Sequence, residues 1–299
     1  NAALRHRYRR GNRGVLFGWG MSVFNLVSLP ASILVGVLLD ADFSLYRWLF
    51  LAQGIFGAGQ ALCFAMMVRG LKNDGETPSV SVREMFRGLV AVFRADREFV
   101  LFEAFFMLYG FGFLGIQPAI PFFARDVLHL SYEQYATAKG VLGQVGLVFL
   151  GPLLGAGLER IRPFRFTGHM CMLLAGYPLL LAASSLTPGL GVPLFYGAWM
   201  VYTTAMAGIH ISWSMSSMHF APEGKVATYQ GFHVTASAFR GFISPALGSV
   251  IMQTFGYTAN FAMSAAFFLA AGILFLRHAR KRALSGLPSG APPSLPGST

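Results

Sequence analysis

Arg240 is the residue whose type and position most directly suggest binding chemistry. It lies in the stretch TASAFRGFISP, about 22 Å beyond Lys225 if the segment is a helix that rises about 1.5 Å per residue. A charge so deep in an apolar segment is costly in a membrane unless it has a partner. We therefore expect Arg240 to bind an anion or a carboxylate, on a substrate or on another helix. A structural ion pair, or a cap on freed backbone carbonyls, is the alternative.

Further polar residues interrupt other apolar segments and are candidates to line a substrate or ion cavity: Lys139, His210, Gln117, Gln144 and Asn25. Lys139 either lines a cavity or extends its ammonium group to the membrane surface. His210 could relay protons or simply be satisfied by a neighbouring carbonyl. The two glutamines could bind substrate or hold helices together. Asn25 is polar near the middle of its segment.

Glu103 lies one turn inside an apolar segment that begins near Phe99. Proton coupling is one role for it, and an ion pair with a loop arginine is the other, which we favour. The stretch GFGFLG (Gly110–Gly115) matches a dinucleotide motif by letter, but no strand precedes it. No metal-ligand spacing, paired catalytic carboxylates or nucleophile elbow appears, so we expect no metal, no cofactor and no enzyme active site.

The composition points to a membrane as the solvent of this chain. Hydrophobic residues make up 55% of it and charged residues only 12%, against about 25% charged residues in soluble domains. The net charge of +11 comes from short clusters between apolar runs rather than from a basic stripe, which argues against a nucleic-acid partner. Cys63 and Cys171 both lie inside apolar runs, so no disulfide framework is implied.

Apolar stretches of about 20 residues predict membrane-spanning helices. The sequence therefore predicts an all-α polytopic membrane protein with about eight transmembrane helices. These candidates are Val15–Leu39, Arg47–Val68, Phe99–Ala124, Glu133–Leu158, Phe166–Leu186, Leu190–Met218, Val226–Thr254 and Thr258–Leu276.

The charges of the connections predict the orientation of the chain. Arginines and lysines gather before the first segment, in every second connection and after the last segment, whereas the alternate connections hold only Arg47 and Arg125 with nearby aspartates. Cytoplasmic loops carry this excess of positive charge. We expect both termini in the cytoplasm and the protein in a bacterial inner (plasma) membrane, in contact with the lipid bilayer.

The connection over residues 70–98 reads as a cytoplasmic linker. KNDGETPS is polar and turn-rich, and SVREMFRGLVAVFR then carries Phe86, Leu89 or Val90, and Phe93 at helical spacing. This pattern predicts an amphipathic helix, either on the inner membrane surface or packed on the ends of its own bundle. Residues 281–299 have the composition of a disordered tail.

An internal repeat relates the first two apolar segments to the last two. Each copy carries a proline near the middle of its helix and then a glycine, Pro30 and Gly36 in one copy and Pro245 and Gly248 in the other, once gaps are allowed. Asn25 lies close to the repeat position of Arg240. Parallel repeats of this kind build some transporter folds.

The connection GAGLER, followed by more basic residues, resembles the loop motif of the major facilitator superfamily of transporters. Gly155, Glu159 and Arg160 take the positions of the glycine, the acid and the base, although Arg162 stands where the family has a second glycine. The stretches LHLSYEQYATAKGVLGQVG, APEGKVATYQG and YRWLF also resemble family segments. The resemblance implies that Gly155, Glu159 and Arg160 form a conformational latch, with Glu159 facing a helix N-terminus near Gly224–Ala227.

The family resemblance implies two six-helix bundles, of which this chain would hold helices five to twelve and lack the first four. Residues 1–69 would be the last two helices of the N-terminal bundle, and 99–280 the complete C-terminal bundle. The expected function is secondary active transport of a small solute by alternating access, with an anionic substrate and coupling protons as further expectations. A non-transporting receptor or scaffold, or an integral-membrane enzyme, is the alternative.

Overall fold

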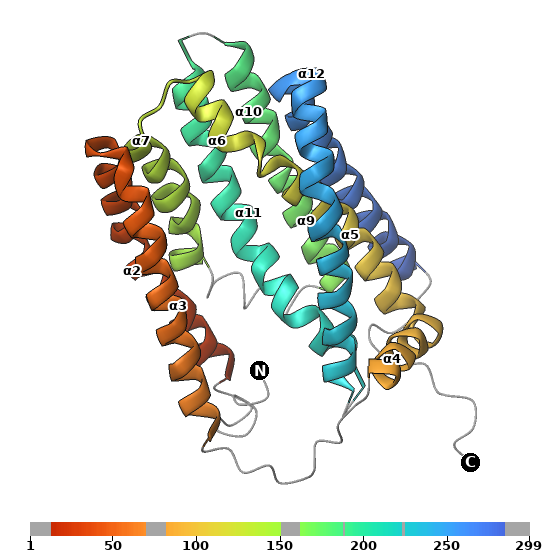
Figure 1. Cartoon of the computed structure of the whole chain (residues 1–299). Helices are drawn as coiled ribbons and strands as arrows, with labels where there is room; N and C mark the ends of the chain where they lie inside the picture. Colours follow the sequence, from red (N-terminus) through yellow and green to blue (C-terminus); the bar gives the residue numbers. More distant parts are fainter. Residues whose placement is uncertain (1–12, 70–81, 151–161, 188, 223–224, 285–299) are drawn as a thin grey trace, which may run out of the picture.

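The computed structural model describes residues 13–69, 82–150, 162–187, 189–222 and 225–284, and every regular element in these ranges is helical (Figure 1). The elements are α2 (Arg13–Ala41), η1 (Phe43–Leu45), α3 (Tyr46–Arg69), α4 (Val82–Ala95), α5 (Arg97–Ile116), α6 (Ala119–Asp126), α7 (Tyr132–Ala136), η2 (Thr137–Leu142), α9 (Pro163–Leu174), α10 (Gly176–Leu186), α11 (Gly191–Phe220) and α12 (Val226–Leu284).

Five stretches of the described chain are long and apolar enough to cross a membrane: Val23–Ala41, Phe43–Met66, Arg97–Asp126, Pro163–Leu186 and Val226–Leu284. They coincide with apolar segments of the sequence. The predicted start at Phe166 was three residues late, because Pro163 occupies the first turn of α9, where a proline has no backbone hydrogen bond to lose.

The 59-residue α12 is two helices that fold back on each other. Gly256 has φ 85°, which interrupts the helix, and Figure 1 shows the chain reversing there. Asn260 donates a hydrogen bond to the carbonyl of Gly248 at 2.9 Å, although a continuous helix would separate them by about 18 Å. We call residues 226–255 the first limb and residues 257–284 the second limb.

One other long segment is broken, and another contains a π-helix. Gln117 and Pro118 separate α5 from α6, where a proline interrupts the helical hydrogen bonds. The helix that begins with α7 continues through the π-helical η2 into residues 143–150. No sequence pattern indicated this π-helix.

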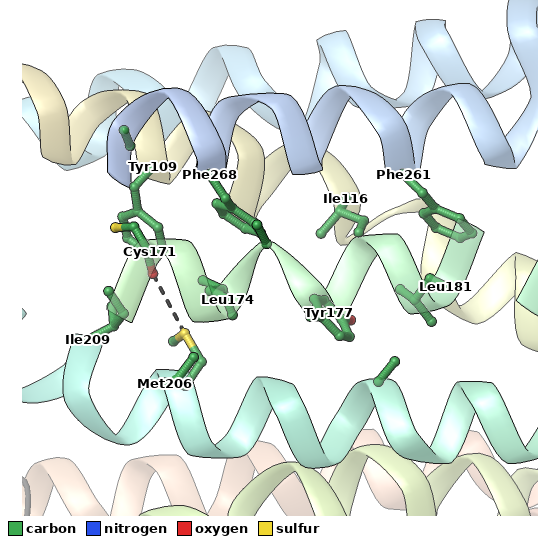
Figure 2. Packing of buried hydrophobic residues seen from close by; sticks show 14 of the residues in the cluster. Tyr109, Ile116, Cys171, Leu174, Tyr177, Leu181, Met206, Ile209, Phe261 and Phe268 are labelled. Carbon is green, nitrogen blue, oxygen red and sulfur yellow. Dashed lines mark hydrogen bonds between the residues drawn. The ribbon is translucent and has the colours of Figure 1, made fainter. Parts of the chain in front are cut away.

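The main core lies between α5, α9–α10, α11 and the second limb of α12. Figure 2 shows its centre, where Tyr177, Phe261 and Phe268 pack with Leu174 and Leu181 from facing helices. Tyr109 donates a hydrogen bond to the sulfur of Met206 at 3.8 Å within this cluster. Such close packing fixes the position of α5 against α12, and these two helices carry the polar residues described below.

The amphipathic helix predicted over residues 82–94 is confirmed as α4. Its Leu89 and Val92 are buried, while Val90 and Phe93 are exposed, so one side packs on the bundle and apolar side chains remain on another side. Val92 packs near Phe99 of α5 and Tyr229 of α12. We call this side of the molecule the α4 end.

The α2–α3 hairpin lies beside α7, at the edge of the fold (Figure 1). Within the described chain its main packing partners outside the hairpin are α7 and η2. Phe24, Val27, Phe50 and Phe56 are exposed along it. The side of the molecule where α2 ends and α7 begins is called the α7 end.

Candidate functional site

Arg240 lies in an aromatic pocket between α5, α11 and the first limb of α12. Its guanidinium donates a hydrogen bond from one Nη to the carbonyl oxygen of Phe106 at 2.9 Å. The guanidinium carbon lies 5.4 Å from the ring centre of Phe106, 5.8 Å from that of Tyr109 and 5.2 Å from that of Trp213. These are cation–π distances, so the pocket stabilises a positive charge without neutralising it.

The burial of Arg240 is nearly complete, at 3% exposed. Among the described residues no carboxylate lies within ion-pair distance of it, and its Nε has no hydrogen-bond partner there. Gly110 makes the pocket possible, because a Cβ at that position would overlap the guanidinium. The hydrogen bond to the carbonyl of Phe106 is of the kind expected if Arg240 caps backbone carbonyls, which was one alternative. The anion-binding role of Arg240 stays a prediction.

A buried acid–base pair lies two helical turns from Arg240. Nδ1 of His233 is 2.9 Å from both carboxylate oxygens of Glu103, and the two residues are 0% and 3% exposed. The expected partner of Glu103, a loop arginine, is therefore wrong. The imidazole ring centre lies 4.3 Å from that of Trp213, which places Trp213 against both His233 and Arg240.

The sequence reasoning missed His233. The available signal was its spacing, because His233 and Arg240 are seven residues apart and share one face of a helix. Nothing in the sequence showed that this face meets Glu103, since that contact depends on how α5 and α12 are aligned.

Further polar contacts align α12 with α5 on both sides of the pair. Towards the α4 end, the hydroxyl of Tyr229 donates to the carboxylate of Asp96 at 3.0 Å. In the other direction, Ser244 donates to the carbonyl of Phe111 at 2.6 Å. Because buried polar groups need partners, these bonds fix the register in which Glu103 meets His233.

A second polar contact joins α2 to α7 at the α7 end. The carboxylate of Asp40 accepts hydrogen bonds from the backbone N–H groups of Tyr132 and Glu133, each at 2.7 Å. Phe43 stacks on the ring of Tyr132, with ring centres 5.8 Å apart. Asp40 thus caps the first turn of α7 from another part of the chain.

Two glycines let α2 approach α7 and η2 closely. A Cβ at Gly36 would lie 2.8 Å from the Cα of Glu133 and 2.9 Å from the Cβ of Ala136. Gly140 faces Ser32 in the same way, with the serine side chain in the space that a Cβ would need. The Asp40 contact therefore sits on a tightly packed helix crossing.

The other predicted cavity residues lie on several different helices. Lys139 is exposed, with its ammonium 5.7 Å from the ring centre of Tyr135. His210 is exposed on α11, and Gln117 is half-buried at the break after α5. Gln144 has a buried side-chain oxygen without a partner among the described residues, and Asn25 is buried. Their role in a cavity stays a prediction.

The predicted latch residues Gly155, Glu159 and Arg160 lie outside the described residues. Their proposed contact near Gly224–Ala227 also includes residue 224, which is not described.

A comparison with protein families identifies the family of this chain. A comparison with curated proteins finds no match. The family model for the Major Facilitator Superfamily matches residues 1–245, which is most of the 299-residue chain. The chain is therefore an integral membrane protein whose apolar helices contact the lipid bilayer, and it belongs to the major facilitator superfamily of membrane transporters.

Proposed function

We propose that this protein is a secondary active transporter that moves a small solute with a negative group by alternating access. We also propose that the α4 end faces the cytoplasm of a bacterial cell. In support, Arg94 and Arg97 lie at the α4 end, whereas Asp40, Asp42 and Asp126 lie at helix ends on the opposite side. Positive charge is enriched on the cytoplasmic side of membrane proteins.

The observation that carries the substrate proposal is the state of Arg240. It is buried in a membrane-spanning helix, it is surrounded by aromatic faces, and its charge is not paired with a carboxylate among the described residues. A guanidinium binds carboxylates and phosphates with directed hydrogen bonds. The Nε of Arg240, which has no partner in the described part of the chain, supplies such a donor. An anionic substrate would therefore complete a site that is already shaped around the cation.

Alternating access is supported by the close packing of one part of α2, near the α7 end. Asp40, Gly36 and Ser32 all lie on the part of α2 that contacts α7 and η2. A closed contact of small residues and two hydrogen bonds, at one end of the molecule, is the kind of interface that rocking could open and re-form.

The proposal is tested by solute uptake into membrane vesicles that contain the whole protein. Radiolabelled anionic, zwitterionic and neutral solutes are compared for wild type, Arg240→Gln and Arg240→Lys. Arg125→Gln is the matched control, because Arg125 is an exposed arginine paired with Asp126. At least one anionic solute should be taken up, and Arg240→Gln should lower its uptake about tenfold or more, as expected for loss of one buried charged contact.

Two results would contradict the proposal. If none of the solutes crosses the membrane faster than in protein-free vesicles, a non-transporting receptor or scaffold is the better description. If an anionic solute is transported equally by wild type and Arg240→Gln, Arg240 is not its binding group.

A further inference from the structure

The helix α4 carries an apolar flank that nothing else in the described part of the chain covers. Leu89 and Val92 are buried against the bundle, whereas Val90 and Phe93 are 48% and 59% exposed. Neighbouring apolar side chains that stay exposed beside polar ones mark a surface that meets lipid or another molecule. We call Val90 and Phe93 the apolar flank of α4.

Arginines border the apolar flank on the side away from the bundle. Arg87 and Arg94 are both exposed, and their spacing of seven residues places them on one face of α4. A helix turns by about 100° per residue, which puts Val90 about 60° round the helix from Arg87, and Phe93 about 60° further towards the buried side. The surface of α4 therefore passes from charged to apolar to buried.

The charges of these arginines are available to a partner. Arg87, Arg94 and Arg97 are exposed, and none of them forms an ion pair with a carboxylate in the described part of the chain. A guanidinium presents several N–H donors in a geometry that matches phosphate. A partner with phosphate groups therefore complements this face in charge.

The depth of α4 follows from its connection to α5. The helix ends at Ala95 and the membrane-spanning stretch begins at Arg97, so only Asp96 lies between them. Figure 1 shows α4 at the end of the bundle, beside the first turns of α5. The last turn of α4 thus lies where α5 enters the bilayer, which is the level of the lipid headgroups.

The orientation of α4 is fixed by contacts with α5 and α12. Asp96 accepts hydrogen bonds from the backbone N–H of Phe99 and from the hydroxyl of Tyr229, each at 3.0 Å. Val92 packs with the same two aromatic residues. Because a roll of α4 would break these contacts, the apolar flank and the arginines stay on the outside of the bundle.

We propose that α4 binds anionic phospholipids at the membrane surface. Arg87, Arg94 and Arg97 bind the phosphate groups, and the apolar flank inserts among the acyl chains. A protein partner fits this surface less well, because a stable protein interface takes about 20–30 residues a side. This inference goes beyond the proposed function and does not depend on Arg240.

The test places a tryptophan in the apolar flank with Phe93→Trp. The whole protein is reconstituted into phosphatidylcholine vesicles that contain either brominated phosphatidylglycerol or the same amount of brominated phosphatidylcholine. Bromine quenches a tryptophan that it contacts, and wild-type protein in the same vesicles supplies the signal of the other tryptophans, which is subtracted. We expect both lipids to quench the added tryptophan, and phosphatidylglycerol to quench it more strongly.

The double substitution Arg87→Gln and Arg94→Gln, added to Phe93→Trp, tests the role of the arginines. Each arginine that is removed should lower the preference for phosphatidylglycerol by up to about fivefold. Arg125→Gln in the same background is the matched control, because Arg125 is an exposed arginine paired with Asp126. It should leave the preference in place.

Salt tests the same attraction without further substitutions, so the test stands even if the double substitution prevents folding. Raising the salt concentration from about 0.1 M to about 1 M shortens the Debye length from about 10 Å to about 3 Å. The preference of Phe93→Trp for phosphatidylglycerol should then weaken, while the quenching by phosphatidylcholine remains.

Several results would overturn the proposal. Long-wavelength emission that neither lipid quenches would place the apolar flank in water. Short-wavelength emission that neither lipid quenches would show a protein surface over the flank, such as a second copy of this chain. Equal quenching by the two lipids, or a preference that neither salt nor the arginine substitutions weaken, would show that α4 does not select anionic lipid.

Discussion

The carboxylate of Asp40 lies 2.7 Å from the backbone nitrogen of Tyr132, although 92 residues separate them in the sequence. This contact and its neighbour at Glu133 join α2 to the first turn of α7. Together with the close approach at Gly36, they hold α2 and α7 together at the α7 end.

Asp40→Asn should loosen this contact, because the neutral amide has one acceptor oxygen for two backbone donors. We expect a shift of about 1 kcal/mol, or about fivefold in population, towards an open α7 end. The reporter is Ser32→Cys, because Gly140 covers Ser32 in this contact. The measurement is the rate at which a membrane-impermeant maleimide labels this cysteine in a protein that also carries Cys63→Ala.

Asp42→Asn is the control for the Asp40 substitution. Asp42 lies two residues away, but its carboxylate accepts from Ser44 within the same turn. Labelling of Ser32→Cys should be unchanged in Asp42→Asn. Equal labelling in Asp40→Asn and wild type would mean that Asp40 does not hold the α7 end closed.

Gly36→Val should open the same contact by steric means. The added Cβ would lie 2.8 Å from a backbone atom of α7, which cannot give way as a flexible side chain can, and such overpacking costs about 1–3 kcal/mol. Labelling of Ser32→Cys should rise. Gly54→Val is the control, because no atom lies within 4 Å of the Cβ that it adds on α3. It should leave the labelling of Ser32→Cys unaltered. Faster labelling in both variants would instead indicate a general loosening of the fold.

Gly110→Ala should push Arg240 out of its aromatic pocket. The new methyl group would occupy the place of the guanidinium, so we expect a loss of about 1–3 kcal/mol in stability, measured by thermal unfolding in detergent. Gly241→Ala, beside Arg240 with open space around the added atom, is the control.

A double-mutant cycle identifies Arg240 as the cause. The effect of Gly110→Ala should shrink when Arg240 is already Gln, because the two substitutions then share one contact. Additive effects would show that Gly110 matters for another reason.

Asn260→Leu should weaken the reversal of α12. Its amide nitrogen donates to the carbonyls of Gly115 at 3.1 Å and Gly248 at 2.9 Å, so its loss leaves buried acceptors unpaired at a cost of about 1–3 kcal/mol. The thermal midpoint should fall. Ser249→Ala, whose hydroxyl bonds only to a carbonyl of its own helix, should change it little, and equal falls would contradict the role of Asn260.

The sequence was sufficient to predict the helices and the position of Arg240 along its helix. Apolar length and periodicity predicted the membrane-spanning stretches, and rise per residue placed Arg240 near the middle of one of them. The amphipathic pattern also predicted α4, although packing decided that Leu89 and Val92, rather than Phe93, face the bundle.

The partners of the site residues could not be predicted in the same way. Glu103 meets His233, and Asp40 meets Tyr132, across long sequence separations. Such pairs depend on helix register and crossing, which periodicity does not determine. The π-helix over Thr137–Leu142, which packs against α2, was also missed, because no sequence pattern indicated it.

The most direct test of Arg240 as the substrate-binding cation is the uptake of an anionic solute. Uptake is compared between vesicles that contain wild-type protein, Arg240→Gln or Arg125→Gln. Uptake should fall about tenfold or more in Arg240→Gln and stay near the wild-type rate in Arg125→Gln. Wild-type uptake in Arg240→Gln, at equal amounts of folded protein, would contradict that role.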